Sequence, residues 1–140
     1  MGSSIYVILI ASGAAIALDD PQTLVADLKE IVRKFSAERD WDQFHNAKDL
    51  AVGIATEAAE LLEIFRFKSE NEVEAMLKNP KSAKKIRDEL ADVFYFALRF
   101  AQKYDIDVST ALRTKIEANA RRYPIGKAKG SNKKYTEFGP

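Results

Sequence analysis

The 140-residue sequence contains no cysteine and only one histidine, His45. Without cysteine there are no disulfides, no thiolate nucleophiles and no zinc–thiolate sites. A single histidine leaves most histidine-based metal sites short of ligands and argues against a Ser-His-Asp triad. The chain also lacks a glycine-rich phosphate-binding loop. Its net charge of +1 gives no general attraction to nucleic acid or to membrane surfaces.

What is present is typical of one soluble, helical domain. Hydrophobic residues make up 46% of the chain and charged residues 31%, and 140 residues are enough to bury a core. Apolar residues recur at helical spacing in several segments. We expect helices over about residues 19–40, 47–67, 73–77, 81–104 and 107–123, the first of them capped by Asp19-Asp20-Pro21. The sequence therefore predicts an all-α bundle of four or five helices.

Both ends of the chain differ from this central region. Residues 5–18 carry no charge and are largely apolar, but they are too few to span a bilayer, which takes roughly 20 residues. Three interpretations stay open: a non-native, disordered or packing extension, a signal segment without its basic flank, and an interfacial anchor. Residues 125–140 are rich in Gly, Ser and Lys. We predict an N-terminal extension over 1–18, a domain over 19–124 and a flexible basic tail over 125–140.

Two pairs of acidic residues are the most informative feature of the sequence. Glu57 and Glu60 lie three apart in one predicted helix, and Glu89 and Asp92 lie three apart in another. Residues at this spacing share one face of a helix. If the two helices are neighbours, four carboxylates converge, and such crowding of like charge requires a compensating cation.

The residue types favour a hard metal ion. Each pair alone is most often ordinary solvated surface, but two pairs beside apolar stripes are less easily dismissed. Di-iron bundle sites need Glu-x-x-His motifs, and His45 is far in sequence from either pair. Oxygen-only ligands suit Mg²⁺, which commonly also holds a phosphate-bearing substrate. A bound metal can activate water for attack on phosphorus.

Other residues supply groups that such a substrate needs. Lys115, Asn119 and Arg122 share a face of the last predicted helix, either as a solvated cationic surface or as contacts to phosphate oxygens. Three aromatic residues flank the helices and form either core or a stacking wall for a base, namely Trp41, Phe44 and Phe67.

Five blocks of the sequence also carry a resemblance to a known family. They are Arg39–His45, Glu57–Glu63, Asp88–Val93, Lys115 with Asn119 and Arg121–Pro124, and Lys134–Glu137. In order and spacing they resemble the MazG-type all-α nucleotide pyrophosphatases, most closely the dCTP pyrophosphatase branch. The resemblance covers about residues 24–137.

This resemblance implies hydrolysis of a nucleoside triphosphate, dCTP or a modified dCTP above all, to the monophosphate and pyrophosphate. It implies that Glu57, Glu60, Glu89 and Asp92 bind Mg²⁺ and serve catalysis. Predicted substrate contacts are Trp41, His45, Phe67, Phe96, Lys115, Asn119, Arg122, Lys134 and Tyr135. It also implies a cytoplasmic homo-oligomer, a dimer or a tetramer, with Lys134 and Tyr135 either in a disordered terminus or folded over a neighbouring subunit's site.

The chain departs from the family pattern at two aromatic positions. Phe67 stands where close relatives resemble Trp, and Phe96 where they resemble Tyr, so each change removes a hydrogen-bonding group. The preferred base is therefore open, and a dUTP or broad dNTP pyrophosphatase is the alternative within the same class. From another class, a non-catalytic helical nucleotide-binding or oligomerising module is the rival. A nucleic-acid partner is disfavoured because the basic residues concentrate in a short tail.

Overall fold

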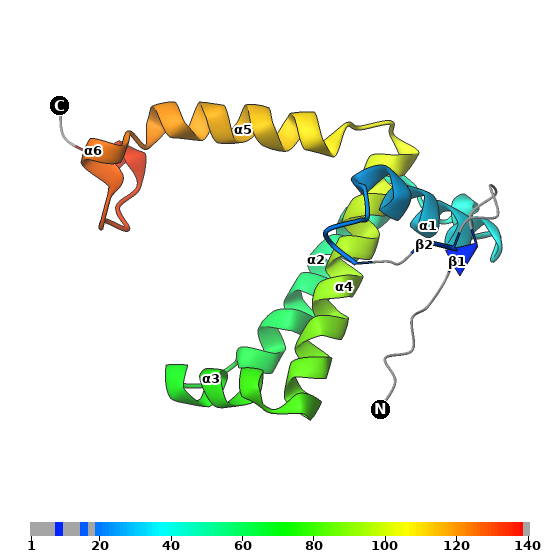
Figure 1. The fold of residues 1–140 in the computed structure, drawn as a ribbon, viewed down its shortest axis with the longest axis horizontal. Coiled ribbons are helices and arrows are strands. Elements are labelled where there is room, and N and C mark those ends of the chain that lie inside the picture. The colour runs from blue at the N-terminus through cyan, green and yellow to red at the C-terminus, as the bar shows by residue number, and fades with distance from the viewer. Residues whose placement is uncertain (1–7, 10–14, 17–18, 139–140) are drawn as a thin grey trace. The chain divides into compact units, whose positions relative to one another are not determined.

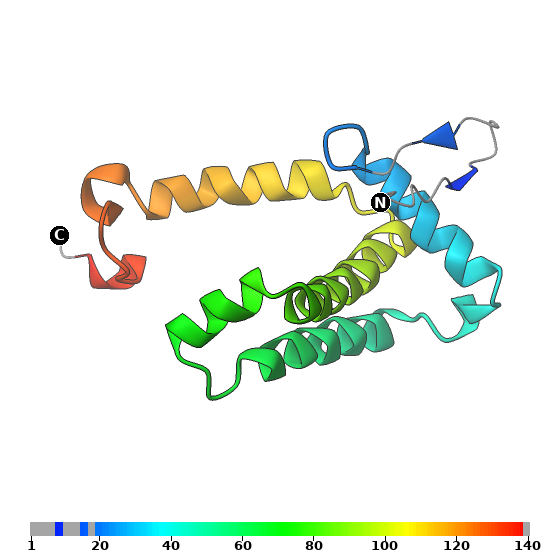
Figure 2. The ribbon, with the colours of Figure 1, turned by 60° about the horizontal axis from the view of Figure 1, so that its bottom comes forward.

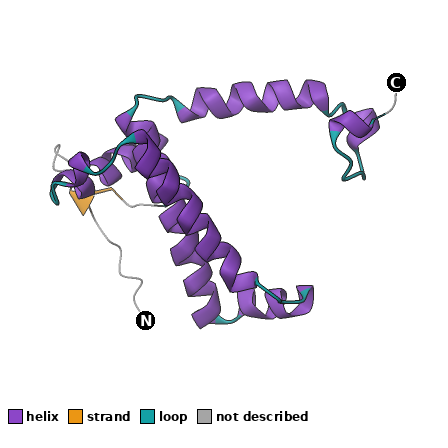
Figure 3. Cartoon of the chain, turned by 180° about the vertical axis from the view of Figure 1, so that it is seen from behind, coloured by secondary structure: helices purple, strands orange, loops and turns teal. Residues whose placement is uncertain are grey.

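The computed structural model describes residues 8–9, 15–16 and 19–138 and contains two compact units, residues 1–105 and 106–140. In the first unit lie α1 (Val25–Ala37), the 3₁₀ turn η1 (Trp41–Gln43), α2 (Ala47–Phe65), α3 (Glu70–Lys78) and α4 (Pro80–Lys103). The second unit holds α5 (Val108–Arg122), α6 (Ile125–Ala128) and the 3₁₀ turn η2 (Tyr135–Glu137). The prediction of an all-α fold is confirmed (Figures 1 and 3).

The interpretations of residues 5–18 fall mostly on residues outside the described ones. Of that segment, β1 (Ile8–Leu9) pairs antiparallel with β2 (Ala15–Ile16), a contact of two residues on each side. Among the described helices, none combines the length and the apolar character needed to cross a membrane.

The first helix begins later than the sequence predicted. Residues 20–22 form a turn instead, because the carbonyl oxygen of Asp19 accepts hydrogen bonds from the backbone N–H of Gln22 and Thr23, at 3.1 and 3.0 Å. The Asp27 carboxylate then accepts the backbone N–H of Leu24 at 2.9 Å, which begins α1 at Val25. The expected Asp cap and N-terminal proline therefore belong to a turn ahead of the helix.

The other long helices begin where capping side chains predict. Asn46 begins α2 by accepting the backbone N–H of Asp49 at 2.9 Å, and Asn79 begins α4 with Pro80 in its first turn. The Asp107 side chain caps α5, and Ser69 begins α3 in a capping box at Glu70, earlier than the start at residue 73 that the sequence predicted. These local hydrogen bonds satisfy backbone donors that a helix leaves unpaired at its start.

The centre of the first unit is an antiparallel hairpin of α2 and α4, connected through α3 (Figure 2). The two long helices approach closely at Gly53, where an added Cβ would stand 2.4 Å from Cδ1 of Phe96. The fully buried Leu50 lies one turn earlier on α2. The helix α1 packs on the same α4, where the hydroxyls of Ser36 and Tyr95 are 2.9 Å apart.

The second unit is built around Tyr123, at the end of α5. Its ring makes edge-on contacts with Tyr135 at 5.7 Å and with Phe138 at 6.0 Å between centroids. The guanidinium of Arg122 lies 5.4 Å from the centre of the Tyr135 ring. The segment after Pro124 thus contains α6 and η2, two short elements that the sequence pattern did not reveal.

Candidate metal centre

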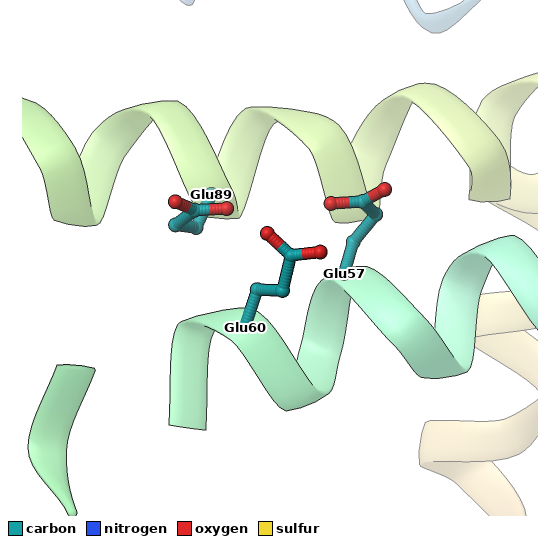
Figure 4. A group of neighbouring side chains, drawn as sticks. All are labelled: Glu57, Glu60 and Glu89. Atoms are coloured by element: carbon teal, nitrogen blue, oxygen red, sulfur yellow. The ribbon is translucent and has the colours of Figure 1, made fainter. Parts of the chain in front are cut away.

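The facing sides of α2 and α4 bring three of the four predicted acids together. Glu57 and Glu60 extend from α2 toward Glu89 on α4 (Figure 4). Each offers a carboxylate oxygen within 4.8 Å of the others. Glu57 and Glu89 are partly buried and Glu60 is exposed, so the cluster opens to solvent on one side.

Asp92, the fourth predicted acid, lies one turn beyond Glu89 and is exposed. Asp92 is outside the group of three acids, but its negative charge acts on the carboxyl of Glu57. Desolvation raises the pKa of the Glu57 carboxyl, and the charges of Glu60, Asp92 and Glu89 raise it further. Because α2 and α4 are antiparallel, Glu57 on α2 is nearer to the level of Asp92 on α4, and Glu60 is nearer to the level of Glu89.

The cluster fits a hard divalent cation. Within residues 19–138, no lysine or arginine forms an ion pair with Glu57, Glu60, Glu89 or Asp92, although other acids of α2 and α4 are paired. Glu63, for example, pairs with Arg66 at 3.3 Å, and Asp88 pairs with Lys84 at 2.6 Å. Converging, unpaired carboxylate oxygens at a half-open position are a donor set that suits a hard divalent cation.

Two lysines that sequence reasoning missed lie on the α4 face that carries these acids. Lys81, Lys85 and Glu89 follow at intervals of four, so they share one side of the helix. Lys81 and Lys85 line a hollow of about 550 Å³ that also includes Glu63 of α2 and Met76 of α3. The sequence contained a signal for these two lysines, because their spacing of four residues places them on the same helical face as Glu89. The three clustered acids do not line this hollow, but Lys85 lies one helical turn before Glu89 on the same face of α4.

The loop before α2 presents two of the predicted base contacts. Trp41 and His45 contact each other edge-on, with ring centroids 6.2 Å apart, and Trp41 also contacts Phe35 at 5.7 Å. Burial lowers the pKa of His45, and the charge of Lys103 lowers it further. Trp41 keeps part of its ring exposed, so an aromatic surface and an imidazole lie side by side.

The two substituted aromatics have different surroundings. Phe67, just beyond α2, is 89% exposed, with a positive φ of 58° and the guanidinium of Arg66 4.8 Å from its ring centre. Phe96 is held between the helices against Gly53 and contacts Tyr95 at 5.2 Å. Phe67 therefore offers its surface freely, whereas the Phe96 ring is packed.

The remaining predicted contacts all lie in the second unit. Lys115, Asn119 and Arg122 are on α5, and Lys134 and Tyr135 belong to the segment that ends in η2. Asn119 is partly buried and Lys115 is exposed. Arg122 and Tyr135 contact each other through the guanidinium and the ring, which brings these two predicted residues together.

Comparison with known proteins identifies the family. The model of the MazG-like family matches residues 52–138, which include all four acids. The chain belongs to the MazG-like family. This agrees with the resemblance found in the sequence, which is thereby confirmed.

Individual relatives of this MazG-like protein extend the match. Human dCTP pyrophosphatase 1 is 33% identical over 118 residues, which are 84% of this chain and 69% of the human protein. The bovine dCTP pyrophosphatase 1 is 32% identical over 112 residues, 80% of this chain and 66% of the bovine protein. A crystal structure of a pyrophosphatase from Archaeoglobus fulgidus is similar with a TM-score of 0.65 at 37% identity, over 71% of this chain and 91% of that one.

Proposed function

We propose that this MazG-like protein adds water across the α–β phosphoanhydride of a nucleoside triphosphate, releasing a nucleoside monophosphate and pyrophosphate, with Mg²⁺ as its metal. Its dCTP pyrophosphatase relatives and its pyrophosphatase structural neighbour make it an enzyme of the nucleoside triphosphate pyrophosphatase class. The observation that carries the proposal is the convergence of Glu57, Glu60 and Glu89, whose carboxylates form no ion pair with a lysine or arginine among the described residues.

In this proposal the acid cluster holds the metal and handles the proton of the attacking water. Glu57, Glu60, Glu89 and Asp92 would hold the ion through carboxylate oxygens. The bound ion would neutralise carboxylate and phosphate charge together and stabilise charge on the leaving group. A carboxylate of the cluster accepts the proton as water attacks the α-phosphorus.

Cations of the chain complete the charge balance. Lys81 and Lys85, on the α4 face that leads to Glu89, are placed to attract the phosphate chain. Lys115, Asn119, Arg122 and Lys134 remain substrate contacts predicted from the resemblance. Substitution of each, with the Michaelis constant for the triphosphate as the readout, tests them one by one.

For the substrate we propose dCTP or a modified dCTP, in a role of clearing unwanted nucleotides from the cytoplasmic pool. The support is the name shared by the mammalian relatives. Trp41, His45 and the exposed ring of Phe67 would contact the base. Since Phe67 and Phe96 lack the hydrogen-bonding groups of tryptophan and tyrosine, dUTP or a broad range of dNTPs is the alternative within the class.

We also propose that the protein works as a homo-oligomer. Among the described residues, only Val32, Leu50 and Ala101 are buried apolar residues. Leu90 and Phe94 of α4 instead line an apolar hollow of about 490 Å³ beside α1. So small a core is insufficient for a chain of this length, and a second copy covering this hollow would enlarge it.

One experiment decides the central proposal. The purified protein is incubated with each dNTP and Mg²⁺, and the products are separated. We expect monophosphate plus pyrophosphate, fastest with dCTP, and we expect Glu60→Gln and Asp92→Asn to remain folded and lose turnover. Diphosphate plus orthophosphate would overturn the bond assignment. Nucleotide binding without any turnover would support the rival, a non-catalytic nucleotide-binding module.

A further inference from the structure

Arg99, near the C-terminal end of α4, is a buried cation with specific partners. Its side chain is 2% exposed, although it lies in the apolar run Phe96–Ala101. The guanidinium forms an ion pair with Asp42 and donates a hydrogen bond to the Gln102 side-chain oxygen. Its Nε–H donates to Nδ1 of His45 at 3.2 Å. Burying an arginine is costly unless its donors are paired, so this arrangement fixes all the groups it contacts.

The hydrogen bond to His45 determines which imidazole nitrogen carries the proton. An arginine N–H can only donate, so Nδ1 must be the unprotonated acceptor. In the neutral ring the proton is then on Nε2. Protonating Nδ1 as well would set two N–H groups against each other beside the positive charge of Lys103, while the Asp42 carboxylate is already paired with Arg99. His45 is therefore held neutral in one tautomer.

The Nε2–H group faces solvent. Of the side chains that the structure describes, no buried nitrogen or oxygen lacks a hydrogen-bond partner. His45 Nε2 has no partner within the described residues, so it must be accessible to water. It lies next to Trp41, whose ring is partly exposed. One fixed donor beside one aromatic ring is the pairing that recognises a flat heterocycle by an acceptor on its edge.

We propose that Arg99 is a positioning residue. Its Nε–H can only donate a hydrogen bond, so its bond to Nδ1 holds His45 in the tautomer that carries its proton on Nε2. This Nε2–H then donates a hydrogen bond to an acceptor atom on the edge of a nucleobase that lies beside Trp41. The identity of the ligand as a nucleobase rests on the proposed function. The roles of Arg99 and of the tautomer rest on the contacts above.

The first measurement needs neither a variant nor turnover. His45 is the only histidine, so the tag-free protein labelled with ¹⁵N-histidine gives one imidazole spin system. We expect an unprotonated Nδ1 and a protonated Nε2 at neutral pH, and a shift of the Nε2–H resonance when dCMP is added. A protonated Nδ1 in the free protein would overturn the assignment to Arg99. An Nε2–H resonance that dCMP at saturation leaves unmoved would overturn the role at the base.

The second measurement separates positioning from general support of the fold. Arg99→Met keeps the length of the side chain and removes its donors. We expect the Michaelis constant for dCTP to rise about fivefold to tenfold, roughly 1 to 1.4 kcal/mol, with a smaller change in kcat. We also expect Arg99→Lys to restore part of the loss, and the Nδ1 and Nε2 resonances of Arg99→Met to show mixed tautomers.

A double-mutant cycle completes the test. If Arg99 acts through His45, then Arg99→Met has no further effect on the Michaelis constant once His45→Ala is present. An undiminished effect of Arg99→Met in the His45→Ala background would overturn the proposal. A failure of the proposed function would be distinguishable, because the protein would then release no pyrophosphate. The NMR measurement of the His45 tautomer in the wild-type protein would still test whether Arg99 fixes the position of the His45 proton.

Discussion

Gly53 of α2 and Phe96 of α4 touch so closely that a Cβ on the glycine would lie 2.4 to 2.7 Å from three ring carbons. Glu57 is one turn after Gly53 on α2, and Asp92 is one turn before Phe96 on α4. In an antiparallel pair these positions are adjacent. The close contact thus sets how near the two acid-bearing faces can come.

Gly53→Ala should force the helices apart at this contact. We expect a loss of about 1 to 3 kcal/mol in the free energy of unfolding, as for other overpacked cores, together with weaker Mg²⁺ binding. Denaturant unfolding and a metal titration measure the two effects. Gly126→Ala is the matched control, since a Cβ there has no neighbour within 4 Å. Equal stability losses in both variants would contradict the packing argument.

The pKa of Glu57 predicts how the metal-free protein responds to pH. Because burial and neighbouring carboxylates raise this pKa above its ordinary value of 4.5, the folded protein holds the proton more tightly than the unfolded chain. The free energy of unfolding should therefore fall as pH rises from 4.5 through the raised pKa. Glu57→Gln removes this pH-dependent contribution. In EDTA, the melting temperature of Glu57→Gln minus that of the wild type should therefore increase as pH rises.

The matched control for this pH series is Glu63→Gln. Glu63 lies on α2 but pairs with Arg66 instead of joining the cluster. We expect no gain in melting temperature for this variant. We also expect Mg²⁺ to abolish the advantage of Glu57→Gln, since the ion neutralises the repelling carboxylates. A constant difference between Glu57→Gln and the wild type at every pH would argue against the crowding of charge.

The lysines beside the acid cluster should contribute to substrate binding. Removing the charge in Lys85→Ala should raise the Michaelis constant for the triphosphate several-fold, roughly 1 kcal/mol, with little effect on folding. The effect should weaken at higher salt, because exposed charges are screened. Steady-state kinetics at two ionic strengths provide the measurement. Lys78→Ala is the control, because Lys78 belongs to α3 and pairs with Glu74. If Lys85→Ala and Lys78→Ala raised the Michaelis constant by similar factors, the effect would come from the net charge of the protein and not from the position of Lys85.

The apolar hollow between α1 and α4 predicts the behaviour of one surface substitution. Phe94 lines the hollow and is 56% exposed. Phe94→Lys should place a charge in the proposed contact between copies and reduce the molar mass measured by light scattering to that of a smaller assembly or a monomer. Leu77→Lys, at a comparably exposed apolar residue of α3, should leave the mass unchanged. An unchanged mass for Phe94→Lys would place the contact elsewhere.

Much of the fold and of the acid site followed from local signals in the sequence. Asn46, Asn79 and Asp107 each cap a helix through their own side chains, so the starts of α2, α4 and α5 could be predicted, whereas α3 begins three residues before the start expected at residue 73. The acid pairs were visible because residues three apart share a helical face wherever that helix lies. The first helix was misplaced at its start, because the carbonyl of Asp19 closes a turn and Asp27 caps the helix in its stead.

The sequence by itself determined where the long helices lie and which acids share a face on each of them, because those properties depend on neighbours along the chain. Only the tertiary structure decided that α2 and α4 run antiparallel with Gly53 against Phe96, which brings Glu57, Glu60 and Glu89 into one cluster with Asp92 one turn away. It also decided that Arg99 reaches back 54 residues to His45 and fixes its proton. Contacts of that kind depend on packing between distant segments, and no local pattern encodes them.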